Sequence, residues 1–253
     1  FDGNTVSIES IHLEGPDTDI EFEGMAQNFL PVLLADSLNS LRAELKFDGK
    51  LYASRLDLDQ MMAFSAIPFE EGEAPEQVID SMRQRKNVRR ERITDFLDGS
   101  FEARIDQFNY HKIDGKDFFG KMAFKNNELD IEGSTEAMGG KFEVEGKEYL
   151  EKAPYLEVKM LCEHVDVSEF LEQSENFGQE VLTSKNLMGT LESKIAIYAY
   201  WDEEGDFLMD KLNVLADVNI NDGELRDFEL LYEYSDYIDI DELRRIKFTT
   251  LQN

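Results

Sequence analysis

Histidine, cysteine and carboxylate side chains are the groups in this chain that could bind metals or catalyse reactions. The three histidines, His12, His111 and His164, are scattered along the sequence. None lies near another at the spacing of metal ligands, and the sequence contains no H-E-x-x-H motif. We therefore interpret each histidine as a surface or strand residue, and we predict no metal site.

One acidic stretch resembles a calcium-binding loop. Residues 217–223 read DVNINDG, which superficially matches the ligand spacing of an EF-hand. The glycine falls one place late, however, and Val218 and Ile220 occupy the alternate positions of a strand. The spacing favours a strand followed by a turn over a calcium site.

Motifs for nucleophilic or phosphate chemistry are missing from the sequence. It contains no G-x-S-x-G, P-loop or G-x-G-x-x-G pattern, and nothing singles out a catalytic pair among its 55 acidic residues. Gly139 and Gly140 follow a strand-like stretch and indicate a tight turn or bulge. Cys162 is the only cysteine, which excludes an internal disulfide and predicts a buried, inert thiol. We predict no catalytic residue and no cofactor, and therefore a protein that is not an enzyme.

The net charge of the chain limits the classes of partner that it can bind. Lysine and arginine number 26 against 55 acidic residues, for a net charge of −29, which repels phosphates and disfavours nucleic acid as a partner. The one local excess of positive charge spans residues 83–92. This segment reads either as a solvated helix face or as a docking patch, through Arg85, Arg89 and Arg90, for an acidic partner or lipid headgroups.

No apolar stretch approaches the length of a membrane span, and residues 1–3 have no signal-peptide character. Two interpretations stay open. The protein is cytosolic, or its targeting segment lies outside this sequence.

Alternation of apolar and polar residues is the dominant pattern, and it predicts strands with one buried face. Within 208–220, Leu212, Val214, Ala216, Val218 and Ile220 share one parity, and Asn221-Asp222-Gly223 then favours a hairpin turn with a return strand from Glu224. A second hairpin is expected around Asn126-Asn127. Further predicted strands are 4–13, 18–24, 40–47, 50–58, 100–111, 138–146, 154–163 and 188–200.

Helices are fewer, and they belong to an internal repeat. We predict helices over 27–36, 75–97 and 168–174, the last with Ser168 as N-cap. The run 56–59, a helix and then 98–101 mirrors the run 165–168, a helix and then 188–191. This repeat predicts an α+β fold, mostly β with a few helices: an elongated, curled antiparallel sheet (a β-groove) of strand-helix-meander modules at 1–55, 56–164 and 165–253.

Several runs of the sequence resemble AsmA-like proteins of Bacteroidota. They are residues 17–24 (DTDIEFEG), 28–31 (NFLP), 135–140 (TEAMGG), 222–225 (DGEL), 225–231 (LRDFELL) and 243–253 (LRRIKFTTLQN). The chain departs from that pattern by lacking the family's N-terminal membrane anchor and its further C-terminal strands, so we expect a truncated piece. The resemblance implies a periplasmic protein, anchored to the inner membrane when full-length, that supports outer-membrane biogenesis and has no catalytic residues.

The same resemblance implies a phospholipid or another acyl-chain lipid as ligand, with envelope proteins as further partners. The residues expected to line the apolar groove are Leu212, Val214, Ala216, Val218, Ile220, Met122, Phe124, Leu129, Ile131, Ile195 and Ile197. A structural or docking module with a dry core is the alternative, because alternation is equally typical of a sheet covered by helices. An enzyme would require polar residues that converge in a cleft.

Overall fold

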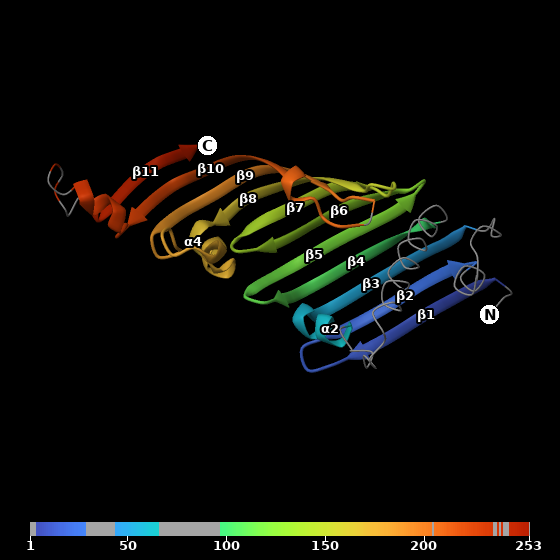
Figure 1. The fold of residues 1–253 in the computed structure, drawn as a ribbon. Coiled ribbons are helices and arrows are strands. Elements are labelled where there is room, and N and C mark those ends of the chain that lie inside the picture. The colour runs from blue at the N-terminus through green and yellow to red at the C-terminus, as the bar shows by residue number, and fades with distance from the viewer. Residues whose placement is uncertain are drawn as a thin grey trace, which may run out of the picture.

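The computed structural model describes residues 4–28, 44–65, 97–203, 205–234, 237, 239 and 243–252, and strands dominate this part of the chain (Figure 1). The strands are β1 (Thr5–Glu14), β2 (Asp19–Gln27), β3 (Leu45–Asp57), β4 (Leu97–Tyr110), β5 (Ile113–Lys125), β6 (Glu128–Ala137), β7 (Gly140–Tyr149), β8 (Tyr155–Asp166), β9 (Leu187–Tyr200), β10 (Asn213–Arg226) and β11 (Arg245–Gln252). Two α-helices, α2 (Leu58–Ser65) and α4 (Val167–Gln173), and three 3₁₀ helices, η2 (Glu175–Gly178), η3 (Met209–Lys211) and η4 (Glu229–Tyr234), complete the described elements.

The eleven described strands form one open sheet whose order follows the chain from β1 to β11. All neighbours are antiparallel except β3 and β4, which run parallel. Figure 1 shows the sheet twisting along its length, with α2 and α4 at the same end of the strands. The prediction of a mostly β, elongated and curled sheet with few helices is confirmed.

Tight turns form where the local sequence tolerates a left-handed backbone. Asn126 and Asn127 have φ angles of 53° and 62° and join β5 to β6, as predicted. Met138 and Gly139, with φ angles of 52° and 73°, join β6 to β7 in the same way. The tight turn predicted at the glycine pair is confirmed.

Two sequence predictions on strands are wrong. Residues 221–223 form no hairpin turn; instead β10 continues through them to Arg226, with a bulge beside β9 at Asp222, whose φ is 49°. This bulge and a type I′ hairpin turn both use a residue with positive φ, so the local sequence does not separate them. The strands predicted at 40–47 and 50–58 are one strand in the described residues, because Gly49 lies inside the β3 ladder.

The predicted helix at 168–174 is present as α4, but its N-cap is Asp166 and not Ser168. Asp166 Oδ1 accepts a hydrogen bond from the Glu169 amide at 2.9 Å. Ser168 instead donates its hydroxyl to the carbonyls of Ser184 and Leu187. The predicted helices at 75–97 and 27–36 lie outside the described residues, except that Leu97 begins β4 and Gln27 ends β2.

The two copies of the predicted internal repeat agree only in their first half, a strand followed by a capped helix. Leu56 and Val165 are the next-to-last residues of β3 and β8, they are 2% and 0% exposed, and each precedes an aspartate that caps a helix. After α2 the chain returns to a parallel strand, so Gly99 pairs with Phe47 at the opposite end of β3. After α4 it returns to an antiparallel strand, and Gly189 lies at the α4 end of β9.

Bulges keep apolar residues on one face of the sheet. Cys162 and Val165 are three residues apart and would point to opposite faces of a regular strand. The register of β8 against β9 shifts between them, and His164 between them has a φ of 56°. Both side chains therefore pack in the same buried cluster under α4, and the burial predicted for Cys162 is confirmed.

Candidate functional site: the apolar face of the sheet

One row of cross-strand neighbours joins the two halves of the predicted groove. Each member pairs with the next in the row Met122, Ile131, Gly146, Val158, Ile197 and Val214. Residues directly opposite each other in a sheet share a face. The apolar residues predicted on β5 and β6 and those predicted on β9 and β10 therefore lie on one face, which we call the apolar face.

The other face of the sheet is charged. The row Lys121, Glu132, Glu145 and Lys159 crosses β5 to β8 on this side, one residue away from the apolar rows. Lys147 lies 2.8 Å from Glu128 and 3.1 Å from Asp130, and these carboxylates raise the pKa of its ammonium. Over β6 and β7 this segregation means that the apolar face is the one that offers surface to a hydrophobic ligand.

At the helical end of the sheet the apolar face is buried in two separate clusters. The first lies under α4 and includes Val165, Leu171 and Leu191. The second lies near α2 and includes Ala53, Leu56 and Ile105. Between the two clusters, over β5 to β7, none of the described helices packs closely on the sheet.

A groove occupies this gap. It has a volume of about 370 Å³, in the range of small-molecule sites, and we call it the central groove. Its lining side chains on the apolar face are Phe101, Ala103, Phe118, Met122, Ile131, Thr135, Phe142 and Val144, together with Gly120 and Gly133. Its lining is almost entirely apolar, so an occupant would be held by burial of hydrocarbon.

Small residues explain why the groove exists. Ala103, Gly120 and Gly133 form one cross-strand row, so three adjacent strands contribute no more than a methyl group. Larger residues stand in the neighbouring rows, with Phe101 and Phe118 on either side of Ala103 in the register. A Cβ on Gly120 would lie 2.9 Å from the Phe118 ring, so this glycine lets the ring lie flat along the groove.

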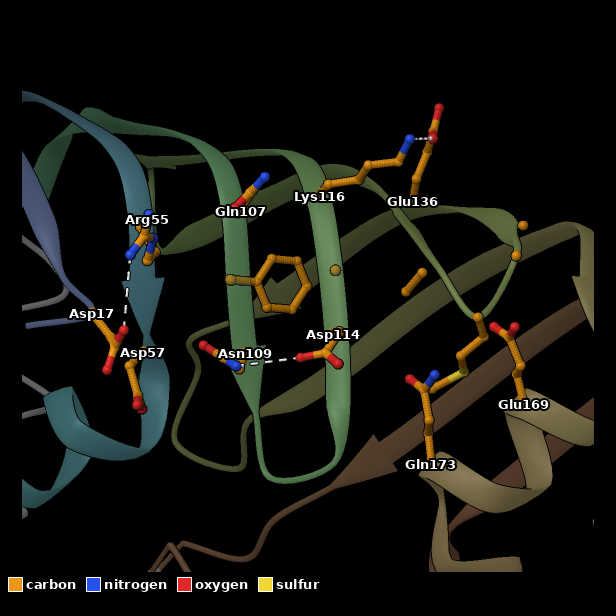
Figure 2. A pocket seen from close by; sticks show the side chains of 16 residues that line it. Asp17, Arg55, Asp57, Gln107, Asn109, Asp114, Lys116, Glu136, Glu169 and Gln173 are labelled. Carbon is orange, nitrogen blue, oxygen red and sulfur yellow. Dashed lines mark hydrogen bonds and ion pairs between the residues drawn. The ribbon is translucent and has the colours of Figure 1, made fainter.

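A second, polar cavity of about 810 Å³ adjoins the central groove at the helical end of the same strands (Figure 2). Phe108 lines this polar cavity, and its ring is 6.0 Å from that of Phe118 in the groove. Figure 2 shows Glu169 and Gln173 reaching from α4 on one side, with Arg55 on β3 at the other. The apolar groove and the polar cavity share no lining residue, but they lie next to each other through the neighbouring rings of Phe108 and Phe118.

Opposite charges pair around the polar cavity, but several carboxylates do not take part. Arg55 lies 3.8 Å from Asp17, and Lys116 lies 2.9 Å from Glu136. In the described part of the chain, no basic side chain pairs with the other three carboxylates of the lining, Asp57, Asp114 and Glu169. This excess of carboxylates favours a positively charged or hydrogen-bond-donating group over an anion.

The remaining predicted groove residues fall into different surroundings. Phe124 and Leu129 pair on the apolar face one row beyond the groove, where Leu129 is buried. Val218 and Ile220 belong to the cluster under α4 or pack against it, so their surface is already covered. Ile195 pairs with Ala216 on the open part of the face.

Leu212 was placed wrongly in a strand. It follows η3 and precedes β10, which begins at Asn213. The alternation of 208–220 is real, but a 3₁₀ turn at Met209 interrupts it before the sheet begins. Arg85, Arg89 and Arg90 lie outside the described residues.

Of the residues that line the central groove, sequence reasoning proposed only Met122 and Ile131. Phe101, Ala103, Phe142 and Val144 lie on strands that were predicted, but none was proposed as a lining residue. The available signal was the parity of each strand combined with its small residues. That signal identifies a groove only when the register shows which small residues stand side by side.

The described residues contain no group of three or more histidine, cysteine, aspartate or glutamate side chains placed to hold a metal ion. None of the described helices is long and apolar enough to span a membrane. No protein-family model, curated protein or solved structure matches this chain.

Proposed function

We propose that this protein binds an amphiphile, with an acyl chain in the central groove and the polar end directed toward the polar cavity. The observation that carries the proposal is the gap between the two buried clusters, where an apolar groove of about 370 Å³ adjoins a charged cavity of about 810 Å³. An apolar trench that ends in polar walls matches a molecule with a hydrocarbon tail and a polar head.

The physical driving force is burial of hydrocarbon. Each buried methylene contributes about 0.8 kcal/mol, so a chain of several carbons gains enough to bind without any specific polar contact. The polar walls supply orientation, since Glu169 and Arg55 offer charge of both signs at the far end. Membership of the AsmA-like family and a place in the bacterial cell envelope stay predictions from the sequence, and an acyl-chain lipid is the ligand that agrees with them.

The test is to fill the groove. Leucine at position 103 adds three carbons at the β4 end of the small-residue row, whereas Ala123→Leu adds the same bulk on the charged face of β5. We expect Ala103→Leu to weaken binding of a phosphatidylethanolamine with a nitrobenzoxadiazole-labelled acyl chain by roughly tenfold, equal to about 1.4 kcal/mol of lost affinity. We expect Ala123→Leu to bind like the unmodified protein.

Fluorescence titration gives the two dissociation constants, and circular dichroism checks that both variants fold. Equal affinities for Ala103→Leu and the unmodified protein would place the lipid elsewhere. The absence of lipid binding by delipidated protein would instead favour the alternative, a structural or docking module, for which the close packing under α4 and near α2 is the supporting observation. Phospholipid found by mass spectrometry after gentle purification would support the lipid ligand directly.

A further inference from the structure

The polar cavity carries more negative charge than positive charge. Its lining includes five carboxylates but only two basic side chains. Both basic side chains lie beside a carboxylate, because Arg55 is 3.8 Å from Asp17 and the Lys116 ammonium is 2.9 Å from Glu136. Three carboxylates are therefore in excess, and the cavity is a place where a positive charge is favoured.

The surplus carboxylates differ in what they already bind. Asp57 caps α2 and accepts hydrogen bonds from the backbone and the side chain of Gln60, both at 2.9 Å. Asp114, on β5, accepts one long hydrogen bond of 3.3 Å from Asn109. Glu169 points from α4 into the same cavity, and none of the described side chains donates to its carboxylate (Figure 2). Asp114 and Glu169 therefore keep most of their capacity to accept hydrogen bonds.

A buried acceptor in the same wall lacks a donor. Gln173 lies one turn after Glu169 on α4 and lines the polar cavity. Its Oε1 atom is buried and has no hydrogen-bond partner in the part of the chain that the structure describes. Burial of an amide oxygen without a donor is unfavourable, and folded proteins rarely leave one in that state. Gln173 thus indicates, independently of the charge, that a donor group belongs in this cavity.

We propose that the polar cavity binds the primary ammonium group of an amphiphile whose hydrocarbon chain lies in the central groove. This inference rests on the proposed function and adds the chemical class of the head group. An ammonium brings a positive charge to Asp114 and Glu169, and it brings three N–H donors, one of which can serve the Gln173 oxygen. Arg55, at the other side of the cavity, keeps N–H donors for the phosphate of a zwitterionic head.

The adjoining groove favours an organic cation over a metal ion. The described carboxylates are not grouped closely enough to hold a metal. The ring of Phe108 in the polar cavity lies 6.0 Å from that of Phe118 in the central groove, so one molecule can reach both. An ammonium attached to a hydrocarbon chain satisfies the charge, the missing donor and the apolar lining together.

The experiment compares lipids that share one nitrobenzoxadiazole-labelled acyl chain and differ in the head group. Phosphatidylethanolamine and phosphatidylglycerol both carry a phosphate, but only the first carries an ammonium. We expect phosphatidylethanolamine to bind about tenfold more tightly. Phosphatidylcholine, whose ammonium has no N–H group, should bind about threefold more weakly than phosphatidylethanolamine. Fluorescence titration of the delipidated protein gives the three dissociation constants.

Neutralising the two available carboxylates should remove the preference. Asp114→Asn/Glu169→Gln keeps the size of both side chains and should bring the affinities for phosphatidylethanolamine and phosphatidylglycerol to within about twofold of each other. The control Glu145→Gln/Glu157→Gln changes the net charge by the same amount on the charged face of β7 and β8. It should keep the preference of about tenfold. Circular dichroism checks that both double variants fold.

The outcomes separate this inference from the proposed function. Equal affinities for phosphatidylethanolamine and phosphatidylglycerol, both lowered by Ala103→Leu, would overturn the ammonium site and leave the lipid groove standing. Absence of binding by all three lipids would overturn both. A preference that survives Asp114→Asn/Glu169→Gln would place the ammonium outside the polar cavity. Equal affinities for phosphatidylcholine and phosphatidylethanolamine would contradict the N–H contact, and with it the choice of a primary ammonium.

Discussion

The apolar face behaves differently under α4 and along β10. Under the helix, Val165 and Leu191 are 0% and 7% exposed and pack in a cluster that also holds Cys162. Farther along the same face, Val214 is 52% exposed although it occupies an equivalent position in the alternating pattern. One sheet therefore carries a dry core at one end and accessible apolar surface elsewhere.

This difference in burial shows what each part of the apolar face contributes to the stability of the protein. Apolar burial stabilises the fold in proportion to the area removed from water, so the covered end supplies stability. The central groove contributes less to folding, and the proposed lipid ligand would account for its apolar residues. Four predictions test this division, in order of decreasing expected effect.

Truncation of a covered leucine should have the largest effect. Leu191→Ala leaves a void beneath α4 and should lower the free energy of unfolding by about 2–5 kcal/mol. Leu215→Ala makes the same chemical change near the start of β10, where the side chain is 60% exposed. It should change the free energy of unfolding by no more than about 0.5 kcal/mol. Urea denaturation measures both, and equal losses would contradict the division.

Loss of the α4 cap should have an intermediate effect. Asp166→Ala removes the acceptor for the Glu169 amide and should cost about 0.5–2 kcal/mol, because α4 covers the cluster that includes Leu171. Asp166→Asn keeps a side-chain oxygen at the cap and serves as control. A cost of Asp166→Asn as large as that of Asp166→Ala would show that the carboxylate acts by charge and not as a cap.

The stability that the Glu224 ion pairs give to β10 and β11 should depend on pH in the acid range. Arg245 and Arg226 bond the Glu224 carboxylate and lower its pKa to about 2, from an ordinary value of 4.5. A depressed carboxyl pKa stabilises the fold fully above its unfolded value and loses that contribution as the pH falls toward the folded value. The stability difference between the unmodified protein and Glu224→Gln should shrink between about pH 5 and pH 2. A difference independent of pH would exclude this ion pair as its source.

The smallest expected effect concerns the reactivity of the Cys162 thiol, which reports how tightly the sheet is packed under α4. Burial raises the pKa of the Cys162 thiol, and the side chain is 3% exposed, so a disulfide reagent should react slowly at neutral pH. Leu191→Ala should speed the reaction by loosening the cluster. Rapid labelling of the folded, unmodified protein would show that the cluster opens readily.

Local sequence determined the strands, the asparagine turn and the existence of α4. Alternation reports one buried face per strand, and Asn126-Asn127 tolerates the positive φ of a tight hairpin, so both are visible without tertiary structure. The same local pattern led to the wrong prediction of a hairpin turn at 221–223. The bulge found there and a type I′ turn both use a residue with positive φ, which here is Asp222. Whether the chain folds back there depends on β9, which lies far away in sequence.

Tertiary structure alone decided the candidate sites. Alternation cannot show which rows adjoin, so Ala103, Gly120 and Gly133 became a groove only through the register of β4, β5 and β6. The apolar character of Val214 and Val218 was plain from the sequence, but only the tertiary structure shows that Val214 is 52% exposed and that Val218 packs against the cluster under α4. Composition determines how much apolar surface a chain has, and long-range packing determines which part of it stays open.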